Sequence, residues 1–89
     1  MRAIVTVIGK DKVGIIASLS NILANCNVNI LDISQTTMQD VFTMIMLVDI
    51  KGLSISFSDL AEQLEKKGVE IGLSVRIQHE DIFDTMHQI

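Results

Sequence analysis

Residues 3–8 form an unbroken run of apolar and β-branched residues, Ala-Ile-Val-Thr-Val-Ile. Both alternating sets of positions in this run avoid charge, which is typical of a strand covered on both faces in the middle of a sheet. The period then changes from two residues to the spacing of a helix. Apolar residues at 15, 16, 19, 22, 23 and 26 lie opposite Ser and Asn, which predicts an amphipathic helix. Asn25 and Asn27 suit its exit, because Asn tolerates left-handed backbone.

Two further strands are expected over residues 28–37 and 41–50, joined by a turn at Met38-Gln39-Asp40. The second of them is mostly apolar on both faces, so it too belongs in the middle of a sheet.

A second helix is expected to begin at Ser56-Phe57-Ser58-Asp59, which has the spacing of a capping box with Asp in place of Glu. Its buried stripe is Phe57, Leu60, Ala61 and Leu64. Lys66 and Lys67 suit the negative end of the helix dipole, and Gly68 is the expected C-terminal stop.

Leu73, Val75 and Ile77 alternate with polar residues, which predicts a last strand with one dry and one wet face, at a sheet edge. After His79, apolar residues at 82, 83, 86 and 89 predict a short helix over 80–89. A helix of this length is marginal alone, so it must dock on something.

The predicted order is therefore β-α-β-β-α-β followed by a short C-terminal helix. Two right-handed crossovers in this order predict an α+β fold, the ferredoxin-like βαββαβ sandwich, with a four-stranded antiparallel sheet and both helices on one face. That fold puts its first and third strands in the middle, the two that are apolar on both faces. We expect one domain over 1–79, with the helix of 80–89 as an addition.

Composition narrows the classes of function. The chain has 89 residues, 48% of them hydrophobic and 20% charged, with a mean hydropathy of +0.43. A domain this small and apolar has more hydrophobic surface than it can bury in one core, so self-association is expected. The net charge of −4 opposes binding to nucleic acid. No segment is apolar for long enough to span a membrane, and no signal peptide is evident, so a cytoplasmic protein is expected.

Few side chains suggest catalysis or metal binding. The one cysteine, Cys26, falls on the buried stripe of the first helix and is read as a core residue. Met44 and Met46 are likewise read as core, and His79 and His87 as surface residues too far apart to form a metal pair. No nucleophile and base stand out as a pair. We therefore predict no enzyme activity, no catalytic residue, no metal and no cofactor.

The junction between the first strand and first helix carries a family resemblance. Gly9-Lys10-Asp11-Lys12-Val13-Gly14-Ile15, followed by Asn27-Val28-Asn29-Ile30, resembles the ACT domain, a small regulatory module that binds amino acids. The likeness extends from about residue 2 to residue 78. The Asp-Ile-Ser-Gln-Thr run from Asp32 and the Phe42-Thr43-Met44 run resemble more narrowly the stand-alone ACT proteins of the UPF0237 family, which are similar to the transcriptional regulator of the glycine cleavage system.

The resemblance implies an amino-acid site at this junction, and the residues give it a physical basis. Backbone amides of Val13, Gly14 and Ile15 at a helix start would meet a ligand carboxylate. Asp11 offers an acceptor for an ammonium group. Lys12 completes the loop, and Val13 stands where many ACT domains have a proline. In the family, a neighbouring subunit supplies the other wall, and its polar residue falls on Asn29.

Structural roles compete with each of these assignments. Asp11 is read first as the cap of the first helix, with ligand contact as the alternative, and Gly14 is equally suited to allow close packing of helix on sheet. Asn29 would also serve to satisfy a backbone group at a sheet edge. Lys10 and Lys12 are read first as solvated charges, with the holding of an anionic effector as the alternative.

Three classes of function remain. The favoured one is a small-molecule-binding regulatory module that senses an amino acid at a homodimer interface and acts on a regulated protein partner. The interface would form through the second strand, whose edge contains Ile30, Leu31 and Ile33 and no Lys or Pro to prevent strand pairing. The alternative is a protein-protein interaction adaptor without ligand, which docks a partner on the apolar sheet face of Ile4, Ile8, Ile45 and Leu47. An enzyme is the third, and a ferredoxin-like phosphatase would need an arginine in the loop, whereas the arginines are Arg2 and Arg76.

Overall fold

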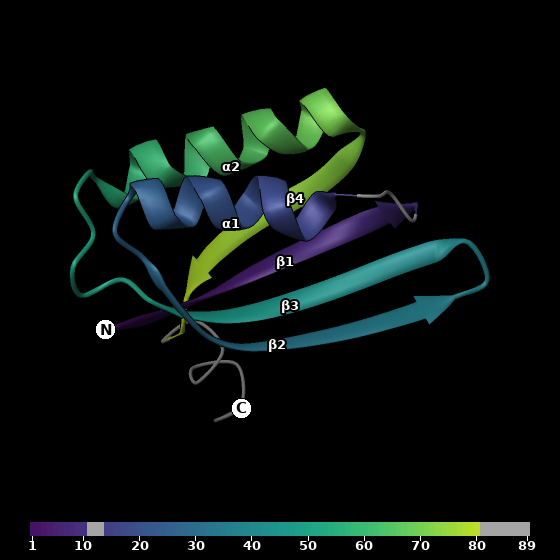
Figure 1. Ribbon diagram of the computed structural model, residues 1–89, viewed down its shortest axis with the longest axis horizontal. Coiled ribbons are helices and arrows are strands. Elements are labelled where there is room, and N and C mark those ends of the chain that lie inside the picture. Colours follow the sequence, from purple (N-terminus) through teal and green to yellow (C-terminus); the bar gives the residue numbers. More distant parts are fainter. Residues whose placement is uncertain (11–13, 81–89) are drawn as a thin grey trace, which may run out of the picture.

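The computed structural model describes residues 1–10 and 14–80, which form four strands and two helices in the predicted order (Figure 1). The elements are β1 (Arg2–Lys10), α1 (Ile15–Asn25), β2 (Asn29–Met38), β3 (Val41–Asp49), α2 (Phe57–Ile71) and β4 (Leu73–His79). Each predicted strand is present, with ends within one residue of those expected for β2 and β3. The helix expected over 80–89 falls almost wholly outside the described residues.

The four strands form one antiparallel sheet in the order β2-β3-β1-β4. β1 and β3 are its central strands, as their two apolar faces predicted, and β4 is an edge. Figure 1 shows both helices over the same face of the sheet, with α1 and α2 side by side. This is the expected ferredoxin-like sandwich.

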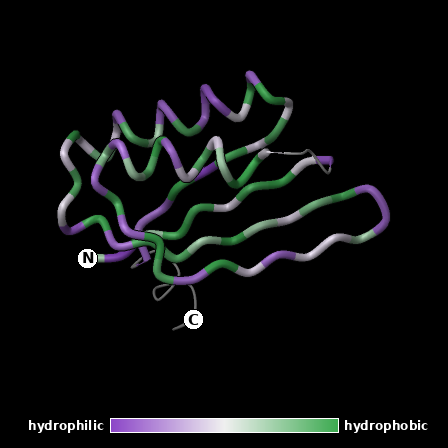
Figure 2. Tube along the Cα trace, viewed as in Figure 1, coloured by the Kyte–Doolittle hydropathy of each residue, from purple (hydrophilic) through white to green (hydrophobic). Residues whose placement is uncertain are grey.

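The core fills the single layer between helices and sheet. Its completely buried members come from every part of that layer: Ala3, Val5 and Val7 of β1, Leu19 and Leu23 of α1, Met44, Met46 and Val48 of β3, and Leu60 and Leu64 of α2. Figure 2 shows the apolar stretches of β1 and β3 running beneath the two helices. Cys26 is buried at the end of α1, which confirms it as a core residue.

The opposite face of the sheet differs from the prediction. The central strands were expected to be covered on both sides, but the described elements cover only one. Ile8 of β1 and Ile45 of β3 are each 45% exposed on the uncovered side. The strands are central, therefore, without being enclosed.

Side-chain hydrogen bonds of nearby residues help to define the start of α2 and the exit from α1. Ser56 caps α2 through its Oγ, which accepts the backbone N–H of Asp59 at 3.1 Å, as the capping-box spacing predicted. Asn27, just after α1, has a φ of 62°, and its Nδ2 donates to the carbonyl of Gly52 at 2.8 Å. Its predicted role in a left-handed exit is confirmed.

The prediction that Gly68 ends α2 is wrong. The helix continues to Ile71, and Gly72, with a φ of 78°, is its C-cap. Gly68 is buried inside the helix, where a β-carbon would lie 2.8 Å from Val75 Cγ2 and 2.9 Å from the carbonyl oxygen of Leu73. Because the helix runs on, Lys66 and Lys67 do not lie in its last turn.

His79 is also more enclosed than expected. Its ring stacks on Phe57, with centroids 4.0 Å apart and planes 19° apart, so it is half-buried at the end of β4 and is not a free surface residue. His87, which was read in the same way, lies outside the described residues.

Candidate functional site

The junction between β1 and α1 ends at a glycine in left-handed conformation. Gly14 is the N-cap of α1, with φ 84° and ψ 5°. Asp11, Lys12 and Val13, three of the predicted ligand residues, lie outside the described residues, as does the predicted capping role of Asp11. Lys10 is exposed at the end of β1, as a solvated charge would be.

The first turn of α1 presents backbone donors. The first helical hydrogen bond runs from the amide of Ser18 to the carbonyl of Gly14, at 3.0 Å. The amides of Ile15, Ile16 and Ala17 precede it and have no acceptor within the helix. No acidic residue lies in that turn, so no carboxylate of its own residues offsets the positive end of the helix dipole. These three N–H groups form an end that favours an anion.

Gly14 is not needed for packing. An ideal β-carbon built on it meets nothing within 4 Å, which overturns the reading that it lets the helix approach the sheet. At Gly9, in contrast, a β-carbon would collide with the side chain of Leu73, its partner on the neighbouring strand β4. The requirement at Gly14 is its positive φ, which a β-carbon strains in any residue with a side chain.

Ile15 fixes the position of the amides. Its side chain is only 4% exposed and belongs to the hydrophobic core, so it anchors the first turn. Any hydrogen bond from Ile15 to a ligand would come from its backbone N–H. The neighbouring Ile16 is 38% exposed, at the surface of the helix.

Asn29 lies far from Gly14 within one chain. It pairs with Asp49 in the β2–β3 register, whereas Lys10, at the junction end, pairs with Val41. Asp49 and Val41 are eight steps apart along β3, roughly 27 Å at about 3.4 Å per residue. Only a second copy could bring Asn29 to the junction, so its role stays a prediction.

The pairing of β2 with β3 also shows which side chains of β2 lie on each face of the sheet. Asn29 is opposite Asp49 and adjacent to Ile30, whose partner Val48 is in the core. Opposite residues in an antiparallel pair share a face, so the Asn29 side chain stands on the face without helices.

Two polar side chains missed by the sequence reasoning lie on the helix side of β2. Gln35 is opposite Met44 and Thr37 is opposite Phe42, and both partners belong to the core. Both polar residues are exposed, because the helices do not cover this edge strand (Figure 1). They belong to the half of β2 nearest the junction end of the sheet. Gln35 lies within the Asp-Ile-Ser-Gln-Thr run that carried the narrower resemblance, and Thr37 directly follows that run.

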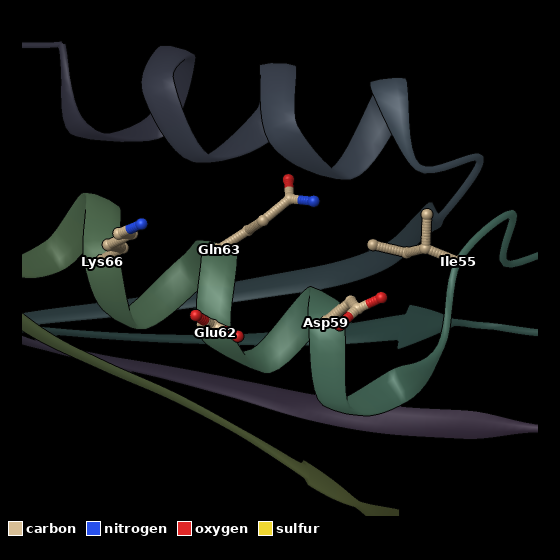
Figure 3. A pocket seen from close by; sticks show the side chains of 5 residues that line it. All are labelled: Ile55, Asp59, Glu62, Gln63 and Lys66. Carbon is tan, nitrogen blue, oxygen red and sulfur yellow. The ribbon is translucent and has the colours of Figure 1, made fainter.

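Two of the surface hollows lined by described residues are formed by other side chains. One of about 220 Å³ borders α2 and the loop before it, and is lined by Ile55, Asp59, Glu62, Gln63 and Lys66 (Figure 3). There Gln63 points toward α1, and its Oε1 lies 3.9 Å from Cys26 Sγ. The other, of about 400 Å³, lies at the β2–β3 hairpin and is lined by Thr36, Met38, Gln39, Val41 and Thr43. Neither contains a residue that the sequence predicted for ligand binding.

Metal binding finds no support in the described residues, where no three His, Cys, Asp or Glu side chains gather in a way that could hold an ion. Neither α1 nor α2 has the length and hydropathy needed to cross a bilayer.

The chain and its fold match known proteins. The profile of the ACT domain matches residues 2–78. The chain belongs to the ACT domain family. It is 55% identical to a UPF0237 protein of Clostridium acetobutylicum over 89 residues, the whole of both chains.

Solved structures also match this chain and its fold. An ACT domain protein from Streptococcus pneumoniae superposes with a TM-score of 0.81 at 40% identity, covering 93% of each chain. A protein described as a putative glycine cleavage system transcriptional repressor shares the fold, with a TM-score of 0.69 at 20% identity, over 86% of this chain and 44% of that one. These relationships support a regulatory module.

Proposed function

We propose that this ACT domain is a homodimeric regulatory module that senses a small amino acid where β1 passes into α1. The observation that carries the proposal is the left-handed N-cap at Gly14, where a β-carbon would meet open space, followed by the amides of Ile15, Ile16 and Ala17, which have no acceptor within the helix. The module regulates a protein partner and is not itself an enzyme.

Different groups of the site bind the two charged ends of the amino acid. Its carboxylate accepts hydrogen bonds from the first-turn amides and gains from the helix dipole. Its ammonium needs oxygen acceptors, which we assign to the carboxylate of Asp11 and the side-chain carbonyl of Gln35. Lys12 and Val13 complete the loop. A bulky residue at position 14 would fill the space that the ligand needs.

The dimer forms through the free edge of β2. This ten-residue strand pairs with β3 on one side only and contains neither Lys nor Pro. Leu31 is 51% exposed and Ile33 is 36% exposed on it. Such an edge invites pairing with its own copy about a two-fold axis. Antiparallel pairing places the Asn29 end of one β2 beside the Met38 end of the other, which brings Asn29 of the second copy toward the junction end.

A cytoplasmic location is part of the proposal. The free thiol of Cys26 is buried, which suits a reducing, cytoplasmic setting. Ligand binding and dimer formation are coupled, because the second copy would supply Asn29 to the site.

A thermal-shift screen with the twenty amino acids tests this function. A ligand at a hundred times its dissociation constant adds about 2.7 kcal/mol to stability, which raises the melting temperature by several degrees in a domain of this size. The matched control is the amide of each active amino acid, which lacks the carboxylate and should give no shift. If no amino acid shifts the transition, the ligand-free adaptor is the better reading.

A further inference from the structure

The sheet face opposite the helices, the open face, has an apolar centre. Four side chains of the two central strands form it, and the pairing of β1 with β3 places them next to one another: Ile4, Ile8, Ile45 and Leu47. Ile8 and Ile45 are each 45% exposed. Met38 and Val41 extend the patch toward the β2–β3 hairpin and are 71% and 49% exposed. A continuous apolar patch on a small domain marks an interaction surface.

Charge on the open face is divided between its two halves. The acidic strand residues of this face lie on β2 and β3, and the basic ones lie on β1 and β4: Asp32 and Asp49 against Arg2, Lys10 and Arg76. The sheet order β2-β3-β1-β4 therefore gives the open face one acidic half and one basic half. Such a surface is complementary to a second copy of itself in which the two halves exchange places.

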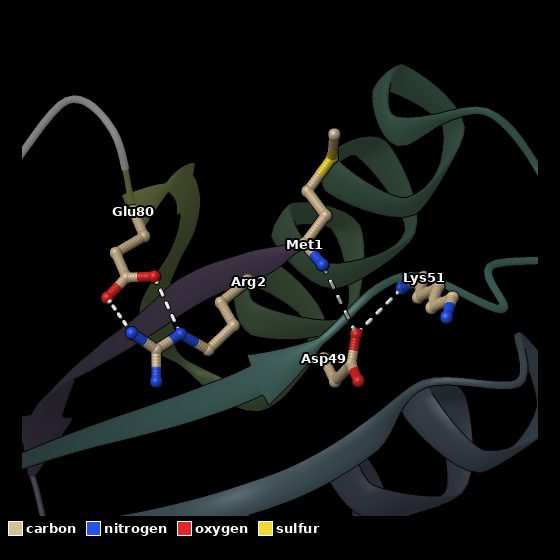
Figure 4. A network of polar contacts seen from close by, with 5 residues as sticks. All are labelled: Met1, Arg2, Asp49, Lys51 and Glu80. Carbon is tan, nitrogen blue, oxygen red and sulfur yellow. Dashed lines mark hydrogen bonds and ion pairs between the residues drawn. The ribbon is translucent and has the colours of Figure 1, made fainter.

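Two of these charges make contacts within the chain at the end of the sheet near the amino terminus (Figure 4). Arg2 donates to Glu80 twice, from Nε to Oε2 at 2.7 Å and from a terminal nitrogen to Oε1 at 2.6 Å. Asp49 accepts the amide of Lys51 at 2.9 Å and lies 3.8 Å from the amino terminus.

The charges on the two edge strands are differently placed. Asp32 accepts the amide of Ile33 at 2.9 Å, and within residues 1–10 and 14–80 neither Asp32 nor Arg76 has an ion-pair partner. Asp32 stands on β2 and Arg76 on β4, three strand spacings or roughly 14 Å apart. They are too distant to pair within one chain, so an ion pair between them needs a second copy.

The direction of a two-fold axis follows from these positions. An axis parallel to the strands lays β2 over β4 and β3 over β1 of the second copy, and keeps each residue at its level. Asp32 is opposite Leu47, which is opposite Ile4, and Ile4 is opposite Gln78. Arg76 is one same-face step from Gln78, roughly 7 Å. Asp32 therefore comes beside Arg76 of the second copy, whereas an axis across the strands lays acids on acids and bases on bases.

The open face is large enough for a specific contact. Four strands at about 4.8 Å and five same-face rows at roughly 7 Å span about 19 by 27 Å. This footprint is on the order of 500 Å² for each copy and 1,000 Å² in total, at the lower end of specific interfaces. A contact of this size is reversible, and we expect a dissociation constant on the order of 0.1–1 mM.

We propose that the open face is a self-association surface, on which two copies pack sheet against sheet about a two-fold axis parallel to the strands. The helices lie on the outside, and the apolar centres of both copies fill the contact. An ion pair of Asp32 with Arg76 of the other copy lies at each side. The β2 edge stays free, so the contact joins two edge dimers into a tetramer at high protein concentration, while at micromolar concentration the edge dimer alone is populated.

Static light scattering of the Ile33→Lys variant tests this contact apart from the β2 edge. The Ile33 side chain lies on the helix side of β2, since its partner Met46 is in the core, so the substitution leaves the open face intact. We expect the mass to rise from that of a monomer toward twice that value between about 10 μM and about 2 mM protein. A variant that stays monomeric over this range overturns the proposal.

Charge reversal with rescue tests the orientation in the same background. Arg76→Asp and Asp32→Arg should each weaken association about tenfold, because each puts like charges together at two symmetric places. The double variant Asp32→Arg/Arg76→Asp restores opposite charges and should recover the starting constant to within about threefold. Lys66→Asp makes the same change of charge on the exposed surface of α2 and should leave association unchanged.

Two results of that comparison contradict the proposal: single reversals that associate like the starting protein, and a double variant as weak as the singles. Neither experiment involves an amino-acid ligand or the β2 edge, so this inference and the proposed function fail independently.

Discussion

Gly68 of α2 packs directly against Val75 of β4, so closely that a β-carbon on the glycine would lie 2.8 Å from Val75 Cγ2. The carbonyl of Leu73 would be 2.9 Å away. This contact sets how near the second helix lies to the edge of the sheet. It also explains a glycine in the interior of a helix, where glycine is otherwise unfavourable.

Gly68→Ala should therefore destabilise the domain. The substitution gains up to about 1 kcal/mol of helix propensity but forces overpacking that costs about 1–3 kcal/mol. We expect a net loss of up to about 2 kcal/mol in urea unfolding. Glu65→Ala, at an exposed position of the same helix, is the control and should change stability by less than about 0.5 kcal/mol. A stabilised Gly68→Ala protein would refute the close contact.

Gly14 is constrained by its backbone angle and not by its neighbours. Gly14→Ala should cost about 1–2 kcal/mol, because a β-carbon disfavours a φ of 84° even in open space. Gly14→Asn should cost less, because Asn adopts the left-handed region more readily. Urea unfolding of both variants measures the difference, and equal losses would argue against the left-handed N-cap.

Ser56→Ala should remove the cap of α2. Loss of the 3.1 Å bond from the Asp59 amide should reduce stability by about 1 kcal/mol. Ser58→Ala, two residues on and also exposed, provides the matched comparison in the same unfolding assay. If the Ser56 cap stabilises α2, Ser56→Ala will lower the free energy of unfolding more than Ser58→Ala does.

The β2 edge predicts the assembly state. Ile33→Lys places a charge on the exposed edge strand and should shift the protein from dimer to monomer in sedimentation equilibrium. Val69→Lys is the control, because Val69 is 80% exposed on α2 and lies away from that edge. If both variants remain dimeric, the interface lies elsewhere.

The sheet topology could be predicted because its signals are local. The apolar residues on both faces of β1 and β3 indicate central strands, and the alternation over Leu73 to Ile77 indicates an edge. What covers the second face is not encoded in those strands, so the expectation that both faces are buried failed at Ile8 and Ile45.

The end of α2 could not be predicted, because two glycines compete for it. Gly68 follows two lysines and has the composition of a helix stop, yet only Gly72 takes the positive φ. The deciding interaction is the contact of Gly68 with Val75, on the strand that follows the helix. Sequence spacing carries no record of that distance.

The sequence could place two residues of the candidate site in the fold. Gly14 and Ile15 lie at a helix start, as expected. The faces of β2 were hidden by a bulge between Ile30 and Asp32, which adds Leu31 to the strand and puts Ile30 and Ile33 on the same face despite their odd separation. That shift moves Gln35 to the helix side, where simple alternation from Ile30 would not place it.

Titration of uniformly ¹⁵N-labelled protein with the amino acids is the most direct test of the proposed sensor. The account predicts that at least one of them gives saturable shifts in the amide resonances of Ile15, Ile16 and Ala17, and that its carboxamide form does not. If none perturbs these three amides, or if the shifts fall instead around Gln63 and Lys66, the site at the start of α1 is contradicted.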